Sequence, residues 1–125
     1  MGDLLYAFEC RAKDADWHTI VNAPTAGKAR YQYWLEALDA WPELKLTEIS
    51  VRKAGAPVSS DMLRQVNEMR GRRFQAGDTV TLRDGRHGRI SGAGGGGAYF
   101  QIWIDGCGPA YVHPCDIATE EARRG

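Results

Sequence analysis

The sequence predicts an α+β fold, in which an N-terminal β-β-α-β unit is joined by a helix to a small C-terminal β-barrel. In the first half, alternating apolar segments flank a stretch with helical periodicity. In the second half, short β-rich segments alternate with glycine turns. The 125 residues allow one domain or two small lobes, and a 43% hydrophobic composition is that of a globular protein. We expect a lobe at 1–57, a connecting helix at 58–73, the barrel at 74–118 and a polar tail at 119–125.

The first two strands are predicted to form a hairpin. In residues 4–11 one face carries Leu4, Tyr6, Phe8 and Cys10 and the other carries Leu5, Ala7, Glu9 and Arg11, which indicates a strand with one buried face. A polar turn at 13–16 separates it from residues 17–23, where the β-branched Thr19, Ile20 and Val21 favour a second strand.

A helix and a third strand complete this half. The helix is predicted at residues 25–41, because apolar residues recur at helical spacing and Pro42 prevents its continuation. Residues 44–53 are expected to form the third strand, with a bulge near Thr47 or Glu48 that reconciles two apolar pairs of opposite phase. The expected buried helix face contains Ala26, Ala29, Tyr33, Ala37 and Trp41, with Trp34 and Leu38 beside it.

The start of this helix is the first candidate binding site. Thr25 is a favoured N-cap residue, because its hydroxyl can accept from N–H groups of the first turn. Gly27 has no side chain, so another group can approach the backbone closely. Lys28 and Arg30 add positive charge at the positive end of the helix dipole, and together these groups could hold a phosphate or carboxylate. The alternative is a capped amphipathic helix whose Lys and Arg are only solvated.

A glycine- and proline-containing linker at 54–57 precedes the second helix. Ser59 or Ser60 can cap this helix, and Gly71 supplies a C-terminal stop. The helix could pack on the first lobe or on a second copy of the protein. Its narrow apolar stripe consists of Met62, Leu63, Val66 and Met69.

Residues 74–118 have the pattern of a small, strongly bent barrel. Short strands alternate with glycine turns, among them the hairpin signal Asp84-Gly85. The strongest strand is 98–104, and its side chains should alternate between the two faces of the sheet. We expect Phe100, Ile102 and Ile104 in the core and Tyr99, Gln101 and Trp103 on the outward face.

The barrel carries the second candidate binding region. Arg86 and Arg89 lie close in sequence to Tyr99 and Trp103, and arginines beside aromatic faces can hold a base and its phosphates. The glycine-rich loop 93–98 could shape itself over such a ligand, or it could be a slack connection. Packing of both aromatic side chains under another element is the alternative.

The sequence contains no recognisable catalytic constellation, so we do not expect an enzyme. The positions that a P-loop fills with glycine and with Ser or Thr hold Asn22 and Ala29 here, which argues against NTP hydrolysis. We also expect no metal or cofactor, because the only candidate ligands lack a fourth member and the paired close spacings of zinc sites. Those candidate ligands are Cys107, His113 and Cys115.

Charge and cysteine content exclude several classes of protein. Sixteen basic and sixteen acidic residues cancel, so no global field draws the chain to nucleic acid or membrane. Residues 64–89 are an exception, with seven arginines against three acidic residues. Three widely spaced cysteines fit reduced thiols. Without an apolar run of membrane-spanning length or a signal peptide pattern, we expect a cytoplasmic protein.

Several of these motifs resemble those of small proteins from tailed bacteriophages and prophages. In that group a segment like 25–31 precedes a Trp-Pro helix end and a strand like 49–52, and His113-Pro114 closes the second half. The pattern Gly77-x-x-Val80 followed by Gly85-x-x-Gly88-x-Ile90 is similar to SH3-like barrels, including the KOW type. The resemblance implies an SH3-like barrel and a protein that works in the bacterial host cytosol.

Small phage proteins of this build often act against host defences. Anti-defence sponges of the Thoeris type look like oligomers that sequester cyclic nucleotide signals without cleaving them. This resemblance implies a homo-oligomer that binds an anionic nucleotide. The residue pattern, and not the resemblance, puts the ligand at the helix start of Thr25, Gly27 and Lys28, with Arg86, Arg89 and Tyr99 as a second anchor. One alternative is a nucleic-acid-binding module that uses residues 64–89, with an affinity that falls steeply with salt. The other is an inhibitor or adaptor that presents exposed aromatic residues to a host enzyme.

Overall fold

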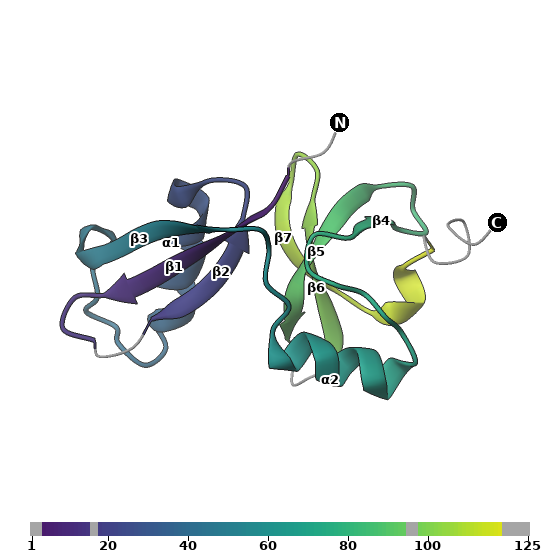
Figure 1. The fold of residues 1–125 in the computed structure, drawn as a ribbon, viewed down its shortest axis with the longest axis horizontal. Coiled ribbons are helices and arrows are strands. Elements are labelled where there is room, and N and C mark those ends of the chain that lie inside the picture. Colours follow the sequence, from purple (N-terminus) through teal and green to yellow (C-terminus); the bar gives the residue numbers. More distant parts are fainter. Residues whose placement is uncertain (1–3, 16–17, 95–97, 119–125) are drawn as a thin grey trace. The chain divides into compact units, whose positions relative to one another are not determined.

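The computed structural model describes residues 4–15, 18–94 and 98–118. Its fold is mixed α+β, with two α-helices and two antiparallel sheets within these residues (Figure 1). Backbone contacts separate the chain into two compact units, one of them Leu5–Pro57 and the other containing residues 58–118. Asp16 and Trp17 of the predicted hairpin, part of the glycine-rich loop and the predicted tail lie outside the described residues.

The Leu5–Pro57 unit is a three-stranded antiparallel sheet with a helix on one face. The strand β1 (Tyr6–Ala12) pairs with β2 (Thr19–Ala23) on one side and with β3 (Ile49–Gly55) on the other. The helix α1 (Ala26–Ala37) contacts all three strands (Figure 1). The predicted elements are therefore present, and the buried side chains of this unit include Phe8, Cys10, Val21, Ala29 and Tyr33.

Two predicted boundaries in this unit are wrong for local reasons. The helix ends at Ala37 and is followed by a turn ahead of Pro42, in which the N–H groups of Ala40 and Trp41 both donate to the Ala37 carbonyl. The predicted bulge is a 3₁₀ turn, η1 (Leu46–Glu48), in which the Lys45 N–H donates to Oε1 of Glu48 at 2.8 Å. The residues before Ile49 are not part of β3. The two apolar pairs of opposite phase therefore do not lie in one strand, and no bulge is needed to reconcile them.

The second unit is a helix and a four-stranded sheet. The sheet has the order β4-β5-β6-β7, so each strand pairs with its neighbour in sequence. Ser60 caps the helix by accepting the Leu63 N–H, and Gly71 ends it at a φ of 65°, as the sequence predicted. The elements are α2 (Asp61–Arg70), β4 (Thr79–Thr81), β5 (His87–Gly94), β6 (Tyr99–Ile104), β7 (Gly108–Val112) and a 3₁₀ turn, η2 (Pro114–Asp116).

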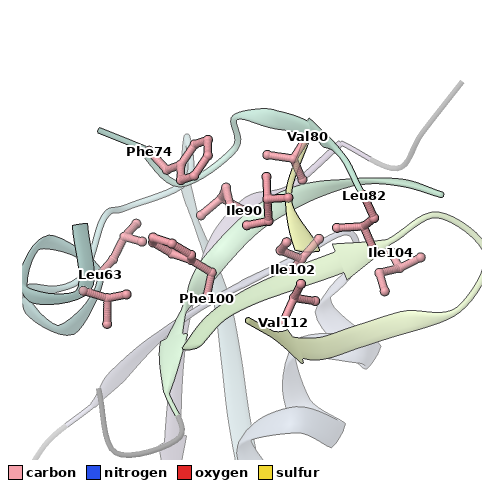
Figure 2. Close-up of a cluster of buried hydrophobic side chains, with 11 residues drawn as sticks. Leu63, Phe74, Val80, Leu82, Ile90, Phe100, Ile102, Ile104 and Val112 are labelled. Carbon is pink, nitrogen blue, oxygen red and sulfur yellow. The ribbon is translucent and has the colours of Figure 1, made fainter. Parts of the chain in front are cut away.

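The core of this unit lies between α2 and one face of the sheet (Figure 2). Phe100, Ile102 and Ile104 all belong to it, which confirms their predicted direction. The rings of Phe74 and Phe100 meet edge to face with centroids 5.2 Å apart, an arrangement favoured by their quadrupoles. Of the predicted α2 stripe, Leu63 and Val66 are buried in this core, whereas Met62 and Met69 are exposed.

The described strands do not form a closed barrel. No ladder joins β4 to β7 within the described residues. Instead, Leu82 forms an isolated bridge with Ile117, and the Ala118 N–H donates to the Thr81 carbonyl at 2.8 Å. The chain that follows β7 thus binds the end of β4, and the predicted barrel remains an open sheet.

Gly88 provides a test of the packing of β5 against β6. A Cβ atom there would lie 2.5 Å from the carbonyl oxygen of Trp103 and 2.7 Å from Cγ2 of Ile102. We expect Gly88→Ala to lower the free energy of unfolding by about 2 kcal/mol or more, because the strands must separate to admit the methyl group. Urea unfolding followed by circular dichroism measures this. The control Gly92→Ala, whose Cβ would lie 3.5 Å from its nearest neighbour, should change stability by less than about 0.5 kcal/mol. Equal losses would contradict this pairing.

The three thiols should differ in reactivity. Burial raises the pKa of the Cys10 thiol from 9.0 to about 11, and Cys10 is buried, whereas Cys107 and Cys115 are exposed. A higher pKa leaves less of the reactive thiolate at pH 8. We expect a chromogenic disulfide reagent at about that pH to modify two thiols quickly and the third only after unfolding. Rapid reaction of all three in the folded protein would show that Cys10 is not buried.

Candidate anion-binding site

The predicted N-cap is present at the start of α1. The Thr25 hydroxyl accepts the Lys28 N–H at 3.2 Å, and the Thr25 carbonyl accepts the Ala29 N–H at 3.0 Å. The first N–H groups of an α-helix have no acceptor inside the helix. Ala26 and Gly27 are both exposed, so their N–H groups are left to water or to a ligand.

The space and charge at this helix start suit a small anion. Lys28 is exposed, and a Cβ atom at Gly27 would meet nothing within 4 Å. The first turn of α1 contains no acidic side chain. Two available N–H groups, the positive end of the helix dipole and a lysine therefore lie within one helical turn, the combination that binds phosphate at other helix starts.

Arg30, predicted as a fourth member of this site, serves the fold. Its Nε donates to the Ile49 carbonyl at 3.1 Å, and the side chain is half-buried. This bond ties α1 to the first residue of β3. The guanidinium is therefore anchored at the sheet, and the available side-chain charge of the helix start comes from Lys28.

The predicted second region is spread along the sheet of the other unit. In the β5–β6 ladder Gly88 pairs with Ile104, and Gly94 pairs with Tyr99. Arg86 precedes the first of these pairs, so Arg86 and Tyr99 lie at opposite ends of a ladder that spans roughly 16 Å at 3.3 Å per residue. The structure brings Arg89 opposite Trp103 and does not bring Arg86 beside Tyr99.

Both arginines of this region have partners inside the unit. Nε of Arg86 lies 2.8 Å from Oδ2 of Asp84, and the Arg86 N–H donates to Oδ1 of Asp84 at 3.0 Å. The backbone N–H of Arg86, and then its guanidinium, lower the pKa of the Asp84 carboxyl, which keeps this pair ionised. Nη1 of Arg89 donates to the Gly77 carbonyl at 3.2 Å. The Asp84 carboxylate therefore offsets the charge of Arg86, whereas Arg89 keeps its charge and is held against the backbone of its own unit.

Of the two predicted stacking residues, only Tyr99 is exposed. Tyr99 is 37% exposed, and its ring meets that of His113 edge-on with centroids 5.7 Å apart. Trp103 is 3% exposed, so the packed alternative holds for this residue and its ring is not available to stack on a ligand. The sequence correctly predicted that Trp103 does not belong to the core cluster that contains its neighbours Ile102 and Ile104. Alternation assigns a side chain to a face, but it does not say whether that face is covered.

The arginine-rich stretch 64–89 largely serves the fold of its own unit. Besides Arg86 and Arg89, three of its side chains donate to backbone carbonyls, and Arg64 pairs with the first residue of α2. A guanidinium that holds a loop is less available to a nucleic acid backbone. Fewer arginines of residues 64–89 are therefore available for binding than the sequence alone indicates. The four contacts are Arg70 to Ala98, Arg72 to Pro114, Arg83 to Cys115 and Arg64 to Asp61.

A polar hollow that the sequence did not predict lies beside β7. It has a volume of about 530 Å³ and is lined by both acidic and basic side chains, including Arg83, Asp84, Arg86 and Asp116. Tyr111 also lines it and is exposed. The balance of charges gives this hollow no clear preference for an anion. Its lining comes from β6, from β7 and from the turns before β5 and after β7, and no sequence motif marks their meeting.

The candidate metal ligands are not assembled into a site. Nδ1 of His113 accepts the Cys115 N–H at 3.1 Å. Within residues 4–15, 18–94 and 98–118, no three His, Cys, Asp or Glu side chains are grouped to hold a metal ion. The helices of the same residues include none with the length and apolar character that a membrane crossing needs.

Comparisons with protein-family models, with curated proteins and with solved structures each found no match to this chain.

Proposed function

We propose that this protein is a non-enzymatic binding protein that captures an anionic nucleotide at the start of α1. The observation that supports it best is the exposed first turn, where the N–H groups of Ala26 and Gly27 lie beside Lys28 with no acidic side chain in the turn. A phosphate group has several acceptor oxygens. It can therefore accept from both N–H groups and from the ammonium at once.

The ligand class that we propose is a cyclic nucleotide signal. This follows the resemblance to small proteins of tailed phages, some of which act against host defences by sequestering such signals. Capture without cleavage requires phosphate contacts and no nucleophile or general base. In this proposal the protein is phage-encoded, works in the bacterial cytosol and assembles as a homo-oligomer.

We also propose that residues 74–118 have an SH3-like architecture. Three features support this: the sequential antiparallel order of β4 to β7, the tight turn at Gly85 with a φ of 94°, and the bridge between Leu82 and Ile117 after the turn η2. Because the sheet is open, the proposed likeness concerns the order and direction of the strands and not the closure of a barrel.

The proposal depends on Thr25, Gly27 and Lys28 rather than on the arginines of the sheet. Asp84 offsets the charge of Arg86, and one N–H of Arg89 donates to the Gly77 carbonyl of its own unit. Tyr99 offers an exposed ring for stacking, but it belongs to the other unit.

Calorimetry tests the proposal with inorganic phosphate, cyclic di- and trinucleotides and cyclic ADP-ribose isomers. We expect at least one cyclic nucleotide to bind with a Kd of about 10 µM or tighter. Lys28→Ala should weaken that binding by about tenfold, because a charged contact to phosphate is lost. The matched control is Lys13→Ala, which removes another exposed lysine of the same unit and should have no effect.

Two outcomes would contradict the proposal. One is the absence of binding heat across the whole panel. The other is an equal loss of affinity in Lys28→Ala and Lys13→Ala, which would indicate nonspecific attraction to positive charge. Binding of DNA with a steep salt dependence would instead favour the nucleic-acid-binding alternative.

A further inference from the structure

The outward face of α1 is apolar. Tyr31 is 52% exposed and Leu35 is 47% exposed, and the half-buried Leu38 follows them at helical spacing. The opposite side of the helix buries Ala29 and Tyr33. The helix therefore carries apolar side chains on both sides, and helices of that kind are normally covered on both.

The side chains around this outward stripe are held in place. The ring of Tyr31 lies 5.8 Å from that of Trp34, and Nε1 of Trp34 donates to the Leu44 carbonyl at 2.8 Å. Trp34, at the edge of the stripe, is therefore already held in place. A surface whose rotamers are already fixed loses less entropy when a partner covers it.

The charges of α1 run against its own dipole. Lys28 lies at the positive end, and neither an acidic residue in the first turn nor a basic residue in the last turn offsets the dipole. The exposed Glu36 and Asp39 lie at the negative end. This distribution is unfavourable for a single helix. In two antiparallel copies, the acidic end of each helix lies beside the basic start of the other, so the same distribution becomes attractive.

The spacing along the helix matches such a pair. At about 100° per residue, Lys28 and Asp39 lie on the same flank of the stripe, beside Leu35. Asp39 lies in the turn that follows α1. Because the cap residue Leu38 keeps a helical backbone (φ −60°, ψ −28°), the path of the helix continues to Asp39, roughly 16 Å along the axis from Lys28. When a two-fold axis passes near residues 34 and 35, Tyr31 faces Leu38 of the second copy, and Lys28 comes within about one helical turn of the second copy's Asp39.

We propose that α1 is a dimerisation helix, and that two copies of this chain pack antiparallel through Tyr31, Leu35 and Leu38 with Lys28–Asp39 pairs at both ends. The interface is self-complementary, as a two-fold dimer requires. It is smaller than a standard interface of about 800 Å² per partner, so we expect a Kd on the order of 10 to 100 µM. It can form without an anion, but dimerisation and anion binding compete for Lys28, because the dimer pairs this lysine with Asp39 of the second copy.

Analytical ultracentrifugation of the full chain from about 5 to about 500 µM measures this equilibrium. We expect a reversible monomer–dimer equilibrium, and we expect Leu35→Gln to raise the Kd by about tenfold or more. The control Met69→Gln changes a side chain of α2 that is 66% exposed, and it should leave the Kd unchanged. Circular dichroism shows whether each variant retains its helix content.

A charge exchange tests the proposed pairs. Lys28→Asp and Asp39→Lys should each weaken the dimer, and the double variant should recover a Kd within about threefold of the original chain. The double variant still lacks Lys28, so its phosphate binding should remain weakened. Failure of this interface and failure of the anion site are therefore distinguishable.

Three results would overturn the proposal: a monomer at every concentration, a dimer insensitive to Leu35→Gln, or a double variant no better than the single ones.

Discussion

The close packing of α1 on its sheet determines every function proposed for this chain. Ala29 and Cys10 are both buried, and Sγ of Cys10 lies 3.9 Å from the Ala29 carbonyl. Small side chains permit this approach, and the bond from Arg30 to the Ile49 carbonyl holds the helix against β3. Because these contacts fix the rotation of the helix, Gly27 and Lys28 are left in solvent and the stripe containing Tyr31 and Leu35 faces outward.

Much of the fold could be predicted from local patterns. Alternation located β1 and β6, and the caps Thr25 and Ser60 were correct because capping depends only on neighbouring residues. The turn η1 was missed because a contact between Lys45 and Glu48 has no periodicity to reveal it. The open sheet was missed because closure depends on which strands meet, and short strands with glycine turns are compatible with both forms.

The candidate site was only partly predictable, because a sequence shows charge but not the partner of that charge. Lys28 is exposed as expected, whereas Arg30 and Arg89 donate to carbonyls that lie far from them along the chain. Periodicity likewise placed Trp103 on the correct face without showing that it is buried. The apolar residues of the outward stripe of α1 can be seen in the sequence. Because the helix has apolar residues on two sides, periodicity alone does not show which side packs on the sheet.

Backbone amide chemical shifts during a titration with a cyclic nucleotide test the central claim most directly, since they report binding residue by residue. If the start of α1 is the anion site, the largest shifts fall on the N–H groups of Ala26, Gly27 and Lys28. Saturable binding that leaves these three signals unmoved and shifts residues of the β4–β7 sheet would contradict it.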